Sequence, residues 1–342
     1  MRIMKKLMTE VKRLAVAAVA GIVCATCAWG ADAPTAAPAA RPLKVLMIGN
    51  SYSQSVLTQT PAIAKAMGLP LDIANLYIGG CPLSRHWQNV EKAGDATFLP
   101  YAVNLSWTSC KEKDSALRRV FPKWRGNIPA ALAAEPWDIV TIQQASGESA
   151  FYERYQPYAS NLVALVRRLA PQAEIRIHET WSYSPYDARL AKWNLTPETM
   201  YARLHDAYAR LARDAGGLRI IPVGTAVQNY RQALPVRYEK LLSQAELDAL
   251  QPPALPSFFG DLCGSARWVK DRKAGTDRLS MDPFHLNRVG AYLQGCVWVA
   301  SLFGADVTKC AYRPDFLSEE QAALLRKVAF ETVKAGVEAS SR

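Results

Sequence analysis

The tripeptide Gly49-Asn50-Ser51 contains the first side chain in this sequence that could do covalent chemistry. It follows a short, mostly apolar run that predicts a strand buried on both faces, and a helical pattern begins a few residues later. This arrangement would place the Ser51 hydroxyl at the carboxyl edge of a parallel sheet, where open α/β sheets bind ligands and the next helix adds positive potential. Ser51 is therefore a candidate nucleophile. A serine hydroxyl is a poor nucleophile alone, so the chain must also supply a base.

The best candidate for that base is His285, one of four histidines in the chain. Asp282 lies three residues before it, and Pro283 restricts the turn between them. A carboxylate at this spacing can accept a hydrogen bond from the imidazole Nδ1–H, which fixes the tautomer and leaves Nε2 free for a hydroxyl. The other three histidines lie in a predicted loop, at a strand end and within a helix, respectively: His86, His178 and His205.

Small or polar residues also follow the other predicted strands. Gly79 and Gly80 end the second strand, where glycine permits unusual backbone angles and close approach to a ligand. Gln143 and Gln144 end the third strand, and His178 ends the fourth. Because a parallel sheet gathers these ends along one edge, we expect them to lie near the serine. Each motif has a structural alternative as a cap or a turn, but their coincidence at one edge favours a hydrolase site.

Trp87, His178 and Trp181 are candidate substrate contacts because they lie near predicted strand ends. Tryptophan rings could stack on sugar rings, although tryptophan more often belongs to a core or its rim. The expected chemistry requires no metal and no organic cofactor. A metal hydrolase built from His86, His178 and Glu179 is the weakest alternative, because the sequence has no His-Glu-x-x-His motif.

The elements that must position these residues alternate between strands and helices. Periodicity predicts five strands, over residues 44–48, 71–78, 137–142, 174–178 and 218–223. It predicts helices over residues 55–67, 128–134, 158–169, 197–215 and 290–303, and a capping box at Ser318 and Gln321 opens a last one. We therefore expect a three-layer α/β/α sandwich with a five-stranded parallel sheet. Residues 81–123 predict a loop-rich excursion, and residues 231–279 a loop-rich insertion that covers the active edge.

The motifs at Ser51, at Gly79-Gly80 and at Asp282-x-x-His285 together resemble those of the SGNH (GDSL-like) hydrolase superfamily, in an uncharacterised exported bacterial branch. Gly49-Asn50-Ser51 is similar to the first block of that family, and Asp282-x-x-His285 is similar to its last block, so the resemblance spans residues 43–304. The resemblance implies a flavodoxin-like fold and ester hydrolysis through a triad of Ser51, His285 and Asp282.

The resemblance also implies how an oxyanion would be held. Gly80 stands where the second block of the family has an oxyanion-hole glycine, so the donors would be the backbone N–H groups of Ser51 and Gly80 plus one side-chain amide. The third block of the family usually supplies that amide from an asparagine, and here Gln143-Gln144 stands instead. A glutamine carries the same amide on one more methylene, so we expect Gln143 to donate, with Gln144 as the second choice.

The first 30 residues predict a secretory signal peptide, with a basic opening, an apolar stretch too short to span a bilayer, and small residues at the cleavage positions. Residues 31–41 then form a flexible leader, and residues 42–342 a single hydrolase domain. Removing the five Lys/Arg and one Glu of the signal lowers the net charge from +11 to +7. No basic patch interleaves with aromatic residues, which argues against a nucleic-acid partner. Export permits disulfides, and we expect one between Cys81 and Cys110.

We therefore expect an exported serine esterase, periplasmic or secreted, with no stable membrane span once the signal is removed. Its substrate would be an acylated carbohydrate or another small ester, and the group removed would be an acyl group such as acetyl. The alternative is a non-catalytic periplasmic glycan-binding protein that retains the hydrolase fold. The sequence does not determine the oligomeric state.

Overall fold

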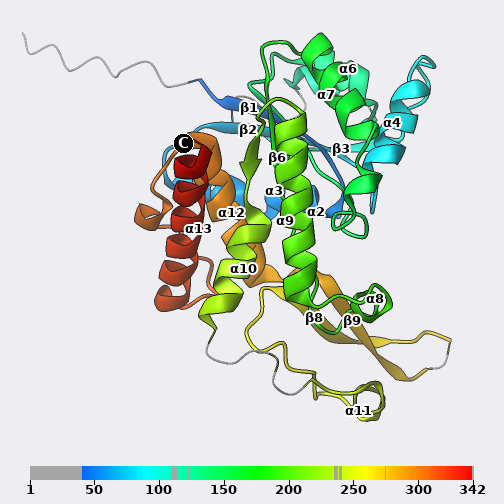
Figure 1. Cartoon of the computed structure of the whole chain (residues 1–342), viewed down its shortest axis with the longest axis vertical. Helices are drawn as coiled ribbons and strands as arrows, with labels where there is room; N and C mark the ends of the chain where they lie inside the picture. The colour runs from blue at the N-terminus through cyan, green and yellow to red at the C-terminus, as the bar shows by residue number, and fades with distance from the viewer. Residues whose placement is uncertain are drawn as a thin grey trace, which may run out of the picture. The chain divides into compact units, whose positions relative to one another are not determined.

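A seven-stranded sheet forms the centre of the computed structural model (Figure 1). The strand order is β4-β3-β2-β1-β5-β6-β7. Five neighbouring strands run parallel and overlap the predicted ranges: β1 (Leu43–Gly49), β2 (Leu71–Tyr77), β5 (Ile139–Ile142), β6 (Glu174–His178) and β7 (Arg219–Ile221). The chain therefore has an α/β fold with a mostly parallel sheet, as its sequence predicts.

The structure describes residues 41–108, 114–121, 123–234, 238, 241–273 and 275–340. The predicted signal peptide and nearly all of the predicted leader lie outside these residues, as does Cys110. In the described part of the chain, no helix combines the length and apolar character needed to cross a membrane.

The predicted number of strands is wrong, because two further strands extend the sheet beyond β2. These are β3 (Tyr101–Ser106) and the two-residue β4 (Arg125–Gly126), and both pairings are antiparallel. They come from the stretch that was predicted to be loop-rich. The buried side chains of β3 alternate at Tyr101 and Val103, a period of two that covers too few residues to stand out in the surrounding sequence.

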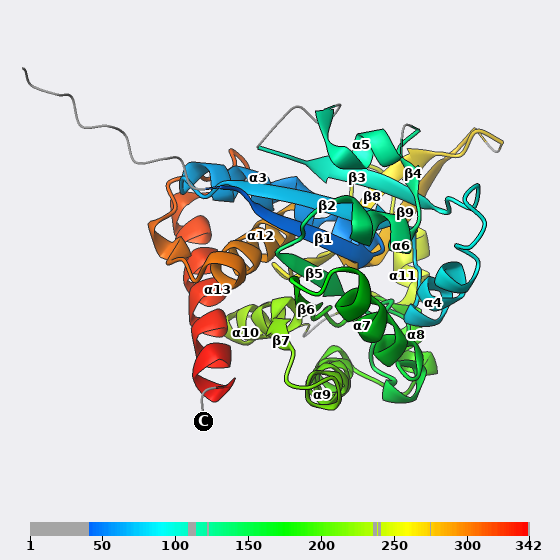
Figure 2. The same cartoon turned by 90° about the horizontal axis from the view of Figure 1, so that it is seen from above.

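Helices cover both faces of the sheet, as Figure 2 shows from above. Val45 and Met47 of β1 point into one core, and Leu46 and Ile48 point into the other. The first core is completed by α3 (Val56–Ala66), α10 (Val223–Ala233), α12 (Arg288–Phe303) and α13 (Glu319–Ser340). The second is completed by α4 (Leu83–Glu91), α6 (Ile128–Ala134), α7 (Tyr158–Leu169) and α9 (Pro197–Asp214). Burial on both faces explains why β1 has a continuous apolar sequence.

The predicted helix starts agree with the observed caps. Thr196 accepts a hydrogen bond from Thr199 N at 3.2 Å, with Pro197 as the first helical residue of α9. Ser318 and Gln321 form a reciprocal capping box, with both bonds at 3.2 Å, at the start of α13. The fifth strand is shorter than predicted. It ends at Ile221, so the residues expected at its end belong to α10.

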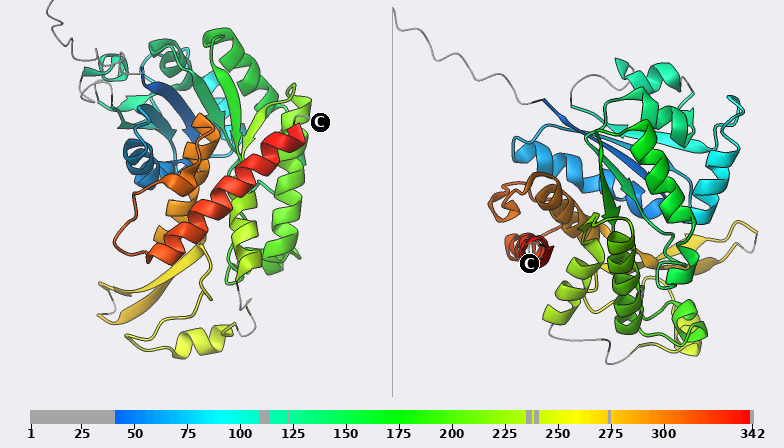
Figure 3. Two further views of the ribbon diagram at one scale, coloured as in Figure 1. Left: turned by 90° about the vertical axis from the view of Figure 1, so that its left-hand side faces the viewer. Right: turned by 45° about the horizontal axis from the view of Figure 1, so that its top comes forward.

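The predicted insertion contains regular structure in addition to loops. It begins with the last turn of α10 and includes the short helix α11 (Gln244–Ala249) and a two-stranded antiparallel hairpin of β8 (Cys263–Lys270) and β9 (Asp277–Leu286). The hairpin projects from the body of the domain beside α11 (Figures 1 and 3). Because β9 contains both Asp282 and His285, the insertion leads directly into the candidate site.

Candidate active site

Ser51 lies where the sequence predicts it, directly after β1 and at the first position of the short helix α2 (Ser51–Gln54). Asn50 caps this helix, and its Oδ1 accepts a hydrogen bond from Tyr52 N at 3.1 Å. The turn requires glycine at position 49, because a Cβ there would lie 2.3 Å from Ser53 Oγ. The sharp turn into α2 therefore presents the Ser51 side chain at the edge of the sheet.

Ser51, His285 and Asp282 form a continuous chain of hydrogen bonds. Ser51 Oγ lies 2.8 Å from His285 Nε2, and His285 Nδ1 lies 2.8 Å from Asp282 Oδ2. Partial burial raises the pKa of the Asp282 carboxyl, but the hydrogen bond and charge of His285, together with two backbone N–H groups, outweigh burial and hold that pKa below its usual value. The carboxylate is therefore ionised at neutral pH and can keep Nδ1 protonated, which leaves Nε2 to accept the serine proton.

A bulge in the hairpin turns both members of the pair toward the serine. Cys263 lies opposite Leu286 and Ser265 lies opposite Asp282, so β9 has two more residues than β8 over this interval. The additional residues close a turn in which Asp282 Oδ1 accepts from the backbone N–H of His285 at 3.1 Å. Bulges bend a strand and redirect its side chains, and they are common beside active sites.

Two buried donors hold the backbone between Asp282 and His285. Tyr52 Oη donates to the carbonyl oxygen of Phe284 at 2.5 Å, and Trp181 Nε1 donates to the same oxygen at 2.9 Å. The Tyr52 and Trp181 rings stack at 3.9 Å with an interplanar angle of 1°. We call these two donors the carbonyl clamp. Sequence reasoning missed the role of Tyr52, although its position next to Ser51 was a usable signal.

Two backbone N–H groups are available to stabilise an oxyanion. In the described part of the chain, neither Ser51 N nor Gly80 N donates a hydrogen bond to a protein acceptor. Gly80 follows β2 with a φ of +60°, which favours glycine, and both Gly79 and Gly80 are exposed. These residues occupy the sheet edge at which the sequence predicts them.

The amide of Gln143, which was predicted to be the third oxyanion donor, already donates a hydrogen bond within the protein. Gln143 is buried, its Nε2 donates to Asn50 Oδ1 at 2.8 Å, and its Oε1 lies 2.7 Å from His178 Nδ1. Asn50 in turn donates through Nδ2 to Cys81 O at 3.2 Å. Gln143 therefore supports the turn before Ser51, and its amide is committed to that contact.

Gln144 is also committed to contacts within the protein. Its Oε1 accepts from Leu83 N at 3.0 Å and Ala145 N at 2.8 Å, and its Nε2 donates to Arg154 O at 3.1 Å. With no exposed surface, this side chain ties α4 to the loop after β5. The prediction that either glutamine extends toward a reacting carbonyl must therefore be corrected: both amides bind protein groups.

The predicted substrate contacts His178 and Trp181 are wrong, because both side chains are completely buried. Burial lowers the pKa of His178 to about 3, so its ring is neutral. The His178 ring packs edge-on against the Trp298 ring, with 5.2 Å between the ring centroids. Trp181 is one of the two donors of the carbonyl clamp. Trp87 remains partly exposed on α4, where it packs against the core. A strand-end position did not reveal which side chains point inward.

The remaining histidines and acids form no metal site among the described residues, where no group of three or more metal-ligating side chains occurs. Burial lowers the pKa of His86 to about 3, and its Nδ1 lies 2.8 Å from Tyr101 Oη. Glu179 is buried as well and accepts hydrogen bonds from His205 Nδ1 and Thr225 N, so it holds the start of α10.

The cysteines do not support a reactive thiol at the site. Cys81, Cys263, Cys296 and Cys310 are free and buried. Burial raises the pKa of the Cys81 thiol to about 12, despite the opposing charge of Arg85. The predicted disulfide partner Cys110 lies outside the described residues.

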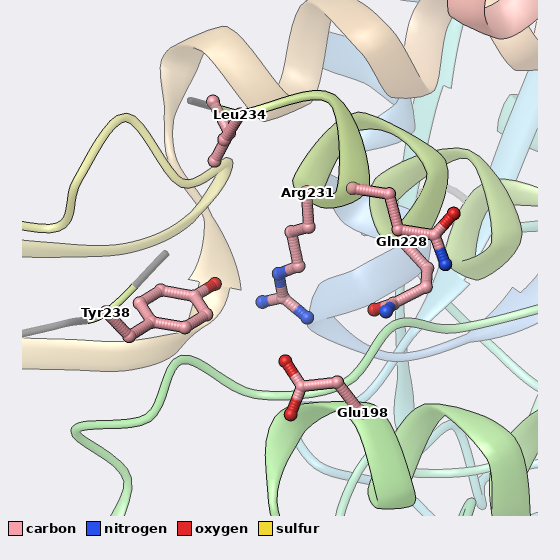
Figure 4. A pocket seen from close by; sticks show the side chains of 6 residues that line it. Glu198, Gln228, Arg231, Leu234 and Tyr238 are labelled. Atoms are coloured by element: carbon pink, nitrogen blue, oxygen red, sulfur yellow. The ribbon is translucent and has the colours of Figure 1, made fainter. Parts of the chain in front are cut away.

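A buried ion pair anchors the loop that follows β6. Arg231 contacts Asp261 through Nε–Oδ1 at 2.9 Å and Nη2–Oδ2 at 3.0 Å, and Arg231 also donates to the carbonyl oxygens of Ser182 and Tyr183 at 3.2 Å. Figure 4 shows the adjoining cavity, whose lining is Glu198, Gln228, Arg231, Gln232, Leu234 and Tyr238. Its volume of about 10 Å³ suits roughly one water molecule, so it has no room for a substrate.

Comparison with known proteins identifies the family of this chain. Residues 44–241 match the model described as "Domain of unknown function (DUF4886)", and this match covers more than half of the chain. The chain belongs to the DUF4886 family. A search among curated proteins gives no match.

A solved structure of the same family is consistent with that assignment, and other solved structures are more distantly similar. A DUF4886 family protein from Bacteroides uniformis is 26% identical, with a TM-score of 0.65 over 86% of this chain and 95% of that chain. A candidate SGNH hydrolase from Slackia heliotrinireducens is 18% identical, with a TM-score of 0.45 over 77% of this chain and 100% of that chain. Phospholipase A1 from Streptomyces albidoflavus is 14% identical, with a TM-score of 0.37 over 76% of this chain and 98% of that chain. The structural neighbours of this DUF4886 protein include proteins described as SGNH hydrolases and GDSL-like lipases.

Proposed function

We propose that this DUF4886 protein is an exported serine esterase that removes acyl groups, such as acetyl, from a hydroxylated substrate such as a carbohydrate. The observation that supports the proposal is the hydrogen-bonded series of Ser51, His285 and Asp282, with 2.8 Å at each step. The sequence signal for export, a basic and then apolar N-terminus, is the basis for the location.

The proposed reaction follows from the positions of these atoms. Ser51 Oγ attacks the ester carbonyl carbon while His285 Nε2 accepts the hydroxyl proton. His285 then gives that proton to the departing alcohol, which leaves an acyl group on Ser51. A water molecule, activated by the same nitrogen, releases the acid and restores the serine. Asp282 keeps the imidazole oriented and stabilises its charged form throughout.

The proposed oxyanion hole consists of the N–H groups of Ser51 and Gly80. Neither Gln143 nor Gln144 adds a third donor while its amide remains bound to Asn50 Oδ1 or Arg154 O. Because removing one oxyanion donor typically costs about 10²–10³ in kcat, we expect slower turnover than in an esterase with three donors.

The exposure of the site favours a large or extended substrate. The side chains of His285 and Asp282 are 33% and 42% exposed, so the reacting groups lie at an open edge of the domain. Small-molecule sites usually enclose most of the ligand surface. An acylated group that projects from a longer carbohydrate chain could reach Ser51 without entering a deep pocket.

Labelling and turnover test this proposal together. A fluorophosphonate probe should modify Ser51, and hydrolysis of p-nitrophenyl acetate should fall at least about 10³-fold in Ser51→Ala, the scale seen when a member of such a triad is removed. Ser160→Ala is a suitable control, because Ser160 is exposed on α7 and, among the described residues, its hydroxyl hydrogen-bonds to Gln156 alone. Absence of labelling, together with equal hydrolysis by wild type and Ser51→Ala, would refute the esterase. Glycan binding without turnover would instead indicate a binding protein.

A further inference from the structure

The β8–β9 hairpin has two faces of different character. Its ladder is regular from the pair Ser265–Asp282 to the pair Lys270–Asp277, and residues that face each other across an antiparallel pair lie on the same side. One side, which we call the open face, carries six residues of this ladder: Ser265, Arg267, Val269, Arg278, Ser280 and Asp282. The triad carboxylate and two arginines therefore share one face.

The opposite face carries four apolar residues that are partly buried, in addition to Lys270 and Asp277. It pairs Ala266 with Met281 and Trp268 with Leu279, and Trp268 Nε1 donates to Ala254 O at 2.9 Å. This contact fastens the hairpin to the segment that follows α11. The contact lies on the side of the hairpin away from the open face, so it leaves the open face uncovered by that segment.

The two arginines of the open face have no ion-pair partner among the residues that the structure describes. Arg267 and Arg278 are exposed, and neither forms an ion pair within the described ranges, whereas Lys270 on the other face pairs with Asp277 at 3.9 Å. Arg272 and Lys273 add two more exposed positive charges at the tip. A guanidinium that already had a carboxylate partner would be a poor ligand for an external anion, and these two arginines are free to bind one.

The distance of the arginines from the reacting atoms is suited to an extended ligand. Arg267 lies opposite Ser280, two residues from Asp282, and Arg278 lies four residues from Asp282 along β9. At about 3.4 Å per residue, these positions are roughly 7 and 14 Å from the carboxylate along the strand. The register therefore places the two cations in a strip that begins at the triad and leads toward the tip of the hairpin. Figure 3 shows the course of the hairpin away from the sheet.

We propose that the open face binds the carboxylates of an acidic polysaccharide and guides its acyl-ester groups to Ser51. This proposal rests on the proposed esterase function and names the class of its substrate. The triad requires acylated hydroxyl groups and the strip requires repeated negative charge, and an acidic polysaccharide carries both on one chain. DNA supplies the charge without any acylated hydroxyl. A phospholipid surface carries its acyl esters beneath the charged headgroups, whereas a polysaccharide carries both groups along one exposed chain.

Binding and turnover should be measured on separate polymers. Binding of polygalacturonate without acetyl groups is followed by calorimetry at 25 and 200 mM NaCl, since this probe requires no catalysis. Turnover is measured as the ratio of kcat/KM for acetylated polygalacturonate to kcat/KM for acetylated mannan, a neutral polymer. The variant is Arg267→Ala/Arg278→Ala. The control Lys327→Ala/Lys334→Ala removes the same charge from exposed positions on α13.

We expect the arginine variant to bind polygalacturonate about tenfold more weakly at low salt, because each exposed ion pair contributes about threefold. The acidic-to-neutral turnover ratio should fall by a similar factor, and 200 mM salt should remove most of the difference. The control should retain the wild-type affinity and ratio.

Failure of this proposal can be distinguished from failure of the esterase. Hydrolysis of acetylated mannan with no binding of polygalacturonate would refute the acidic substrate and leave the esterase intact. Binding that depends on the two arginines, with no hydrolysis of any ester, would refute the esterase and support the anion-binding face. Binding to phosphatidylglycerol vesicles but not to polygalacturonate would overturn the polysaccharide assignment.

Discussion

The carbonyl clamp predicts a measurable effect of Tyr52→Phe. This substitution removes the 2.5 Å hydrogen bond to Phe284 O but keeps the ring that stacks on Trp181. Because Trp181 Nε1 still donates to the same oxygen, no buried acceptor is left unpaired, and the loss in free energy of unfolding should be about 1 kcal/mol. The loosened backbone lets His285 move relative to Ser51, so kcat should fall about tenfold with little change in KM.

A double-mutant cycle with Trp181→Phe sharpens the prediction. With both donors removed, the partly buried carbonyl oxygen of Phe284 has no protein donor, which costs up to about 1–3 kcal/mol beyond the separate losses. Urea denaturation followed by circular dichroism gives the unfolding free energies, and p-nitrophenyl acetate hydrolysis gives kcat and KM. Tyr292→Phe is the control: it also loses a partly buried hydroxyl bond to a backbone carbonyl, that of Tyr312 at 2.8 Å, and with it a 3.4 Å contact from Arg326 Nη1, on a helix that does not hold the triad.

Two results would refute this reasoning. If Tyr52→Phe loses stability like Tyr292→Phe but retains the wild-type kcat, the clamp supports the fold and does not position the base. If the unfolding free energies of the two clamp substitutions add without coupling, then the two donors do not share the Phe284 oxygen in solution.

Three further predictions concern charged groups. Asp282→Asn should lower kcat of the proposed esterase by about 10⁴, because an amide cannot stabilise the imidazolium and favours the wrong tautomer, and steady-state hydrolysis measures this. Glu179 raises the pKa of His205, so the pair stabilises the fold at pH values below the ordinary histidine pKa, and this contribution is lost as pH rises through the raised value. His205→Gln should therefore cost about 0.5 kcal/mol at pH 5.5 and less at pH 8.5, by urea denaturation at both pH values. Arg231→Leu should destabilise the fold by about 3–5 kcal/mol, because the Asp261 carboxylate would remain buried without its partner, and thermal unfolding would show this as a large fall in Tm.

Local pattern predicted the parts of this protein whose contacts are local. The apolar run of β1 indicated a central strand because both of its faces are buried, and the five parallel strands alternate with helices in sequence as they do in space. Asp282 and His285 could be paired in advance because a three-residue turn brings a carboxylate to its own imidazole. The hairpin that holds them was missed, since half-buried strands with bulges lack a clean period.

Only the tertiary structure decided which way the strand-end side chains point. Successive residues of a strand emerge on opposite faces, so a shift of one position separates a buried group from an exposed one. For this reason Gln143 reaches Asn50, His178 packs against Trp298, and Trp181 binds Phe284 O, although all three follow the strands that were expected to supply the site. The sequence by itself determined the fold class and the three groups proposed to react. The packing of the folded chain determined how Ser51 meets His285 and which neighbours hold them in place.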